Sequence, residues 1–118
     1  MADRFVVNLT REDAERASVA LVVANAAVAS GKETAVFLST EAVRLSQRGY
    51  ADDVHVEGFA PLAELISRYT EAGGGILGCQ SCFKKYGLDE GQLIGGTSVV
   101  CSASLVELMS GGVSSLSY

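Results

Sequence analysis

Short apolar runs alternate with longer segments of mixed character along the chain. Runs of this length, rich in Val, Ile, Leu and Phe and bounded by polar residues or glycine, are typical of buried strands. The predicted strands cover residues 5–9, 34–38, 76–77 and 98–100, with a last strand near 114–118. A helical segment separates each strand from the next, so the sequence predicts an α/β fold with a mostly parallel sheet of about five strands and helices on both faces.

The first helical segment is the longest. Thr10 followed three residues later by Asp13 has the form of a capping box, which predicts a helix from there to about Ser30. Gly31 supplies the stop. The segment is apolar nearly all round, so both of its faces are expected to be covered.

The other helices are shorter and have recognisable ends. Ser39 or Thr40 caps a helix that runs to Gln47, and the polar stretch 48–58 is predicted to be a loop. The only proline, Pro61, opens a helix through Tyr69. Two further helices follow the later strands, and glycines end them: 80–86 before Gly87, and 102–109 before Gly111-Gly112.

Length and composition limit the classes of function. With 118 residues, the sequence predicts a single domain, 1–118. Apolar residues make up 48% of the chain and charged ones 19%, so part of the surface is expected to face another subunit of a homo-oligomer. The net charge of -5 argues against nucleic acid or an anionic membrane as a partner.

The chain is expected to be cytoplasmic. Its first residues, 1–4, lead directly into a strand and lack the features of a signal peptide. The longest apolar run, 19–29, is interrupted by Asn25 and is shorter than the roughly 20 residues that a membrane span needs. In a reducing compartment the three cysteines indicate a metal site or a reactive thiol rather than disulfides.

Candidate site residues come from the carboxyl ends of the predicted strands, where parallel sheets place their sites. These positions are Asn8 and Thr10, Ser39 and Thr40, Cys79 with Gln80 and Cys82, and Cys101 with Ser102. All three cysteines therefore lie at one edge of the sheet. If the third and fourth strands are neighbours, Cys101 approaches Cys79. We expect Asn8, Ser39, Gln80 and Cys101 to line a pocket around Cys79.

Cys79 and Cys82 lie between a strand and a helix. Free backbone N–H groups and the positive end of the helix dipole meet at such a point and favour a thiolate. Cys79, next to the strand, is the expected nucleophile, and a persulfide on it would be held by these N–H groups. Cys82 lies one helical turn later and has a secondary role, either resolving the sulfur species or packing. Lys84 and Lys85 are predicted to be an ordinary solvated face.

Three other interpretations of the cysteine region are weaker. A thioredoxin-like redox pair would have a proline or aromatic residue within or before the pair and a proline after it, but Pro61 precedes it. A zinc site would need His55 with all three cysteines, and only one pair has short spacing. Residues 73–78 match G-x-G-x-x-G, but they end a helix and open a strand, the reverse of a dinucleotide fingerprint. No cofactor or metal is therefore predicted. For Cys101 the favoured interpretation is a small buried hydrophobe closing its strand.

The sequence resembles the DsrE/DsrF-like family, which includes TusD-like sulfur-relay subunits. The resemblance covers nearly the whole chain, and the most specific stretch runs from Ile76 through Cys79 to Gly87. Further similar stretches are residues 24–31, 34–39, 93–96 and 99–108. The resemblance implies a three-layer α/β sandwich, assembly into trimers or hexamers, and a persulfide-carrying role for Cys79. Cys82 has no counterpart in many members, and Cys101 stands where glycine is more common.

Two functions follow as expectations. The first is a cysteine-based sulfur carrier or sulfurtransferase that receives sulfur from a donor protein and passes it to an acceptor protein. The alternative is a non-enzymatic binding or regulatory module, in which the cysteines line a small-ligand or metal pocket between subunits. Stoichiometric zinc or iron that is lost on mutation of Cys82 would favour the second, and persulfide loading that requires Cys79 would favour the first. A third possibility is a structural oligomer whose cysteines only fill the core.

Overall fold

The computed structural model describes residues 4–118, which form one five-stranded sheet in which every strand is parallel to its neighbours. Its spatial order is β4-β3-β2-β1-β5. The strands are β1 (Arg4–Leu9), β2 (Glu33–Leu38), β3 (Gly75–Cys79), β4 (Thr97–Val100) and β5 (Ser114–Ser117). The predicted α/β fold with a parallel sheet is confirmed. The expectation about a leader peptide falls largely on residues 1–3, which lie outside the described part.

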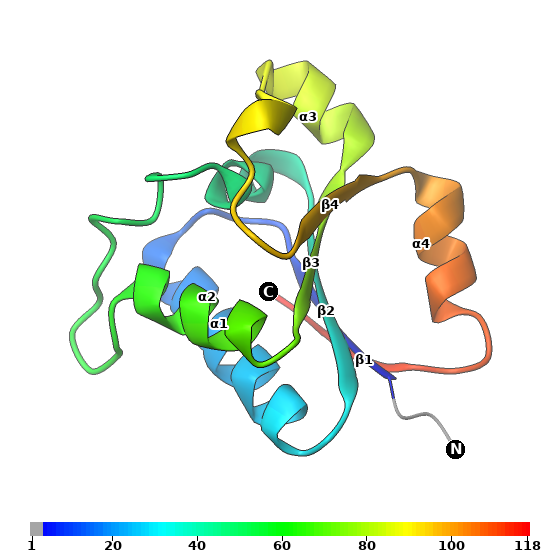
Figure 1. Cartoon of the computed structure of the whole chain (residues 1–118), viewed down its shortest axis with the longest axis horizontal. Coiled ribbons are helices and arrows are strands. Elements are labelled where there is room, and N and C mark those ends of the chain that lie inside the picture. The colour runs from blue at the N-terminus through cyan, green and yellow to red at the C-terminus, as the bar shows by residue number, and fades with distance from the viewer. Residues whose placement is uncertain (1–3) are drawn as a thin grey trace.

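The helices make this sheet the middle of three layers (Figure 1). Helices α1 (Ala14–Ala29) and α2 (Leu62–Glu71) pack side by side on one face, and α4 (Ser102–Met109) lies on the other. Helix α3 (Gln80–Tyr86) follows β3 at the carboxyl edge of the sheet. Two 3-10 helices, η1 (Thr40–Ser46) and η2 (Glu90–Gln92), complete the connections. We refer to the two sides of the sheet as the α1/α2 face and the α4 face.

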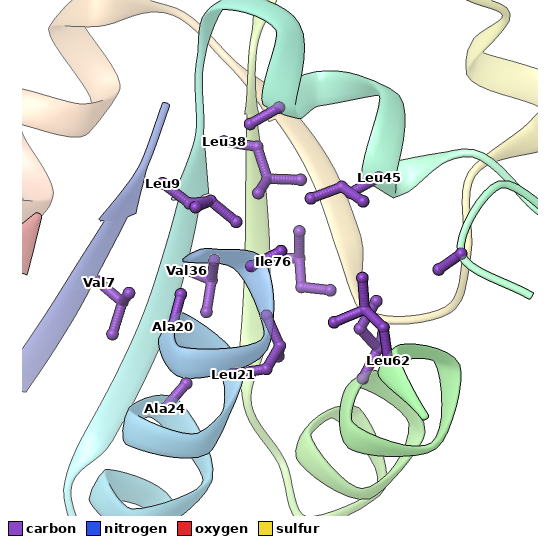
Figure 2. Packing of buried hydrophobic residues seen from close by; sticks show 14 of the residues in the cluster. Val7, Leu9, Ala20, Leu21, Ala24, Val36, Leu38, Leu45, Leu62 and Ile76 are labelled. Atoms are coloured by element: carbon purple, nitrogen blue, oxygen red, sulfur yellow. The ribbon is translucent and has the colours of Figure 1, made fainter. Parts of the chain in front are cut away.

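The hydrophobic core lies between the sheet and the α1/α2 face. Strand residues alternate between the faces, so alternate positions of β1, β2 and β3 point into this core. Figure 2 shows them meeting the helices and η1. The buried strand residues are Val7, Leu9, Val36, Leu38 and Ile76, and they pack against Ala20, Leu21, Ala24, Leu45 and Leu62. The intervening residues of the same strands point to the α4 face.

The long helix begins later than the sequence predicted. Its N-cap is Asp13, whose carboxylate accepts the backbone N–H of Arg16 at 3.0 Å. The predicted cap, Thr10, is engaged elsewhere, because its hydroxyl donates to the carbonyl oxygen of Tyr118 at 3.0 Å. Thr10 therefore connects the end of β1 to the segment after β5 instead of starting the helix.

The expectation that α1 would be covered on both faces is also wrong for the single chain. Ala17, Ala20, Leu21 and Ala24 are buried, but Val22 on the outer side of the helix is 43% exposed. The small side chains let α1 pack against both the sheet and α2, and the outer stripe stays in solvent. Within residues 4–118, no helix combines the length and apolar character that crossing a membrane requires.

Candidate functional site

Cys79 is the last residue of β3 and the residue that caps α3. The chain turns sharply here because Gly78 lets the Phe83 ring of α3 fold back against the strand. A Cβ on Gly78 would lie only 2.6 Å from that ring. Gly87, in the left-handed conformation with a φ of 62°, then ends α3. No side chain caps the start of α3, and Cys79 is partly buried against the core.

Cys82, on the next turn of α3, is held by the chain segment after β2. The backbone N–H of Thr40 donates to the Cys82 Sγ at 3.1 Å. Thr40 adopts a left-handed backbone, with a φ of 51°, which is rare for a threonine. Its hydroxyl donates to the carbonyl oxygens of Thr10 and Ser39. These bonds fix the conformation that directs its N–H to Cys82.

The environment of Cys82 disfavours its thiolate. Burial comes first among the causes that raise the pKa of Cys82, and the Cys79 thiol beside it acts in the same direction. The Thr40 N–H and the charge of Lys85 act in the opposite direction and do not reverse the effect. The Cys82 thiol is therefore less readily ionised than an ordinary cysteine thiol.

Cys101 follows β4 directly, as Cys79 ends β3. It is the N-cap of α4, and it is exposed. The sequence had favoured a buried hydrophobe at this position, and that expectation is wrong for the single chain, because the start of α4 is solvent-exposed and does not cover the thiol. The Cys101 Sγ lies 3.4 Å from the Ser104 hydroxyl oxygen. Hydrogen bonds from the Ser104 hydroxyl and backbone N–H lower the pKa of Cys101.

Cys79 and Cys101 both line a cavity of about 290 Å³. Strands β3 and β4 are neighbours, as proximity of the two cysteines required, and Cys79 is in register with Val100. Gln80 lines the same cavity, as do Phe37, Ser81, Val100, Ser102 and Ala103. Phe37 was missed by the sequence reasoning, although its alternation with Val36 and Leu38 in β2 places it on the α4 face.

Asn8 and Ser39 do not line this cavity. Asn8 lines a neighbouring cavity of about 170 Å³ on the α4 face, on the other side of Phe37. Its Nδ2 donates to the Ser117 hydroxyl at 3.4 Å, and its Oδ1 is buried without a hydrogen-bond partner. Ser39 caps η1, and its backbone N–H donates to the Leu9 carbonyl oxygen. Both residues lie near the carboxyl edge but belong to its β1 and β2 side.

The residues of the possible zinc site are not assembled. In the described part of the chain, no three His, Cys, Asp or Glu side chains gather where they could hold a metal ion. The His55 ring Nε2 instead makes a 2.9 Å hydrogen bond with the Phe59 carbonyl oxygen. This bond keeps His55 within its own loop.

Comparison with known proteins identifies the fold family. The model of the DsrE/DsrF-like family matches residues 4–117. The chain belongs to the DsrE/DsrF-like family. No curated protein sequence matches it significantly.

Solved structures with the same fold cover almost the whole chain. The chain is similar to the YchN protein of E. coli, with a TM-score of 0.80, 18% identity and complete coverage of both chains. It also resembles MTH1491 of Methanobacterium thermoautotrophicum, a protein of unknown function (TM-score 0.72, 17% identity, 98% of each chain covered). BT1422 of Bacteroides thetaiotaomicron is a third such structure (TM-score 0.71, 19% identity, 98% and 95% covered). At these identities the likeness establishes the fold.

An ionic cluster that the sequence did not predict supports the α3 end of this DsrE-like site. Glu12 accepts hydrogen bonds from Arg44 at 3.0 Å and from the Tyr50 hydroxyl at 2.5 Å. The Tyr50 bond is the main cause that lowers the pKa of Glu12, with Arg44 adding to it. The Arg44 guanidinium lies 4.5 Å from the Tyr86 ring centre. The cluster thus joins the β1 and β2 connections to α3, and its members are too far apart in sequence to form a recognisable motif.

Proposed function

We propose that this protein is a sulfur carrier of the DsrE type, with Cys79 as the thiolate that accepts and passes on sulfane sulfur. The observation that supports this most strongly is the position of Cys79. It stands at the carboxyl end of β3, before an uncapped helix, at the wall of an open cavity. Membership of the DsrE/DsrF-like family supports the sulfur-relay theme independently.

The reaction needs no resident cofactor. The Cys79 thiolate attacks the outer sulfur of a donor persulfide, a new S–S bond forms on Cys79, and the donor leaves as its thiolate. The reverse exchange with an acceptor thiol returns Cys79 to its starting state. No net oxidation or reduction takes place, because the sulfane sulfur only changes its thiol partner. Free thiols are required throughout, which fits our expectation of a cytoplasmic protein.

Cys79 and Cys82 are proposed to have different roles, because their surroundings differ. Cys79 lines the cavity, whereas Cys82 does not and is bonded to Thr40. A thiol whose pKa is raised is less often ionised at neutral pH and attacks a persulfide more slowly. Cys82 is therefore proposed to hold α3 in place rather than to carry sulfur.

A homo-oligomer, a trimer or hexamer, is part of the proposal. The supporting observation is the α4 face, where, among residues 4–118, the eight-residue helix α4, which has no buried residue, is the only helix over the sheet. Val106 on the outer side of that helix is 66% exposed. A second copy placed there would remove this apolar surface from water.

Intact masses after incubation with a persulfide donor test the carrier function. Wild type and Cys82→Ser are expected to gain one sulfur atom, and Cys79→Ser is expected to gain none under the same limiting donor. The gained sulfur must be lost again on treatment with a reducing thiol, since a persulfide is labile to exchange. Equal and equally labile loading of Cys79→Ser would contradict the proposal. Failure of every variant to load would favour the ligand-binding alternative.

A further inference from the structure

We propose that Cys101 takes the sulfane sulfur from Cys79 and presents it to the acceptor, so that the two thiols form a relay across the shared cavity. The inference rests on the proposed carrier function and adds a second sulfur-bearing residue to the same site. It concerns the transfer out of the protein, for which the exposed Cys101 is better placed than the partly buried Cys79.

Strand register brings the two cysteines close. Cys79 pairs with Val100 across the β3–β4 ladder, and Cys101 is the next residue. With neighbouring strands about 4.8 Å apart and a rise of about 3.3 Å per residue, the two Cα atoms are separated by roughly 6 Å. Cα atoms at such a separation lie within the range that allows direct sulfur–sulfur bonding.

Both cysteines line the space in which the transfer would occur. Each cysteine precedes the first residue of a helix, α3 in one case and α4 in the other. The cavity between these helix starts is lined by both cysteines, and by the polar Gln80, Ser81 and Ser102. No side chain accepts a hydrogen bond from the backbone N–H groups at the start of α3. This space can hold a persulfide on one cysteine while the other approaches it.

Cys101 is better suited than Cys82 to receive the sulfur. Cys82 is partly buried and accepts the Thr40 N–H, whereas Cys101 is exposed and contacts the Ser104 hydroxyl. The Ser104 groups lower the pKa of Cys101, while burial raises that of Cys82. Of these two thiols, Cys101 is thus the more readily ionised, and it is exposed, so an acceptor protein can reach it.

The exchange is balanced. The Cys101 thiolate attacks the outer sulfur of the Cys79 persulfide and forms a new S–S bond. The old S–S bond breaks, and its electron pair stays on the Cys79 Sγ, which leaves as a thiolate. The proton of the outer sulfur stays on that sulfur as it moves to Cys101, so no oxidant, reductant or further reactant is needed.

Time-resolved mapping of the sulfur tests the relay. The protein is given a limiting amount of glutathione persulfide, alkylated after increasing times, and digested for mass spectrometry. In wild type and in the matched control Cys82→Ser, the sulfur is expected first on the Cys79 peptide and later on the Cys101 peptide. In Cys101→Ser it should stay on Cys79, and its release to an added small thiol acceptor should be at least ten times slower. In Cys79→Ser the Cys101 peptide should remain unloaded.

The outcomes separate the relay from the carrier function. Absence of sulfur on Cys79 in wild type would overturn both. Normal loading of Cys79 with an unchanged rate of release from Cys101→Ser would overturn the relay alone. Direct loading of Cys101 in Cys79→Ser would also overturn it, because Cys101 would then not depend on Cys79.

A second measurement tests the juxtaposition without any sulfur donor. Mild oxidation of Cys82→Ser with diamide is expected to give a disulfide between Cys79 and Cys101, seen as a linked peptide pair of one chain. A matched sample of Cys82→Ser/Cys101→Ser should give no such link. If the two cysteines of Cys82→Ser stay unlinked while the protein keeps its native circular dichroism, they are too far apart for the relay.

Discussion

The two faces of the sheet are packed very differently. On the α1/α2 face, two helices and η1 cover strand residues that are almost completely buried, such as Val7, Leu9 and Val36. On the α4 face, the single helix α4 has no buried residue, and three cavities lie along the sheet, two of them meeting at Phe37. The dense face holds the main hydrophobic core, and the loosely covered one leaves room for a site and a partner.

The cysteines divide between these environments. Cys82 is directed toward Thr40 and the densely packed side, whereas Cys101 is at the start of α4, where the helix leaves it exposed. Cys79 ends a strand between them and lines the cavity of the α4 face. The comparison predicts that stability and sulfur chemistry respond to different substitutions.

The largest expected difference is between two Leu→Ala variants. Leu62 is fully buried in α2, so Leu62→Ala is expected to lower the free energy of unfolding by about 2–5 kcal/mol. Leu105 in α4 is only partly buried, and Leu105→Ala should cost less than half as much. Urea denaturation of both variants measures this. Equal losses would mean that the α4 face is packed as firmly in solution as the α1/α2 face.

Substitution of the glycines near the two ends of β3 distinguishes a loss of stability from a change in the geometry of the site. A Cβ on Gly74 would lie 2.2 Å from the buried Tyr69 ring, and one on Gly78 would lie 2.6 Å from Phe83. Gly74→Ala and Gly78→Ala are each expected to cost about 1–3 kcal/mol, because buried rings must move. Only Gly78→Ala should also change the rate at which Cys79 is alkylated, since Phe83 anchors α3. An equal change in Gly74→Ala would show that the site responds to general loosening of the fold.

The pH dependence of alkylation distinguishes the two flanking thiols. A free cysteine ionises with a pKa of about 8.5. Because the pKa of Cys101 is lowered and that of Cys82 raised, the Cys101 rate should reach half of its maximum at a lower pH than the Cys82 rate. Peptide mapping after iodoacetamide pulses measures both in one sample. Ser104→Ala should move the Cys101 midpoint upward and leave that of Cys82 unchanged; coincident midpoints would contradict the assigned environments.

The last prediction concerns a charged residue introduced on the exposed side of α4. It should have the smallest effect on the stability of the single chain but a large effect on assembly. Val106 and Val22 are both exposed valines, one on α4 and one on α1. If subunits meet on the α4 face, Val106→Glu should dissociate the oligomer at micromolar concentration, and Val22→Glu should not. Light scattering after size exclusion gives the mass. Dissociation by Val22→Glu alone would place the interface on α1.

Much of the fold could be predicted because local signals agreed with each other. The strand runs 5–9 and 34–38 lie within one residue of the observed bounds, since apolar and β-branched residues fill them and polar residues flank them. The start of α1 was misplaced because Thr10 and Asp13 both fit a cap locally. Thr10 does not cap the helix because its hydroxyl is hydrogen-bonded to Tyr118, which is distant in the sequence.

The residues at the strand-to-helix boundary could be predicted from the sequence, but the positions of the other site residues could not. Cys79 and Gln80 follow from the strand-to-helix boundary alone, and both line the cavity. Strand order is not encoded in any local pattern, so the closeness of Cys101 and the separate positions of Asn8 and Ser39 needed the structure. The exposure of Cys101 depends on how little of the sheet edge the short α4 covers, which no periodicity reports.

The most direct test of the account is the identity of the cysteine that first carries sulfur. Wild-type protein is exposed briefly to a limiting persulfide donor, alkylated at once, and mapped by peptide mass. The account predicts that the first added sulfur is found on the Cys79 peptide, before any appears on the peptides of Cys82 or Cys101. Earlier or equal labelling of Cys82, or a pattern unchanged by Cys79→Ser, would contradict it.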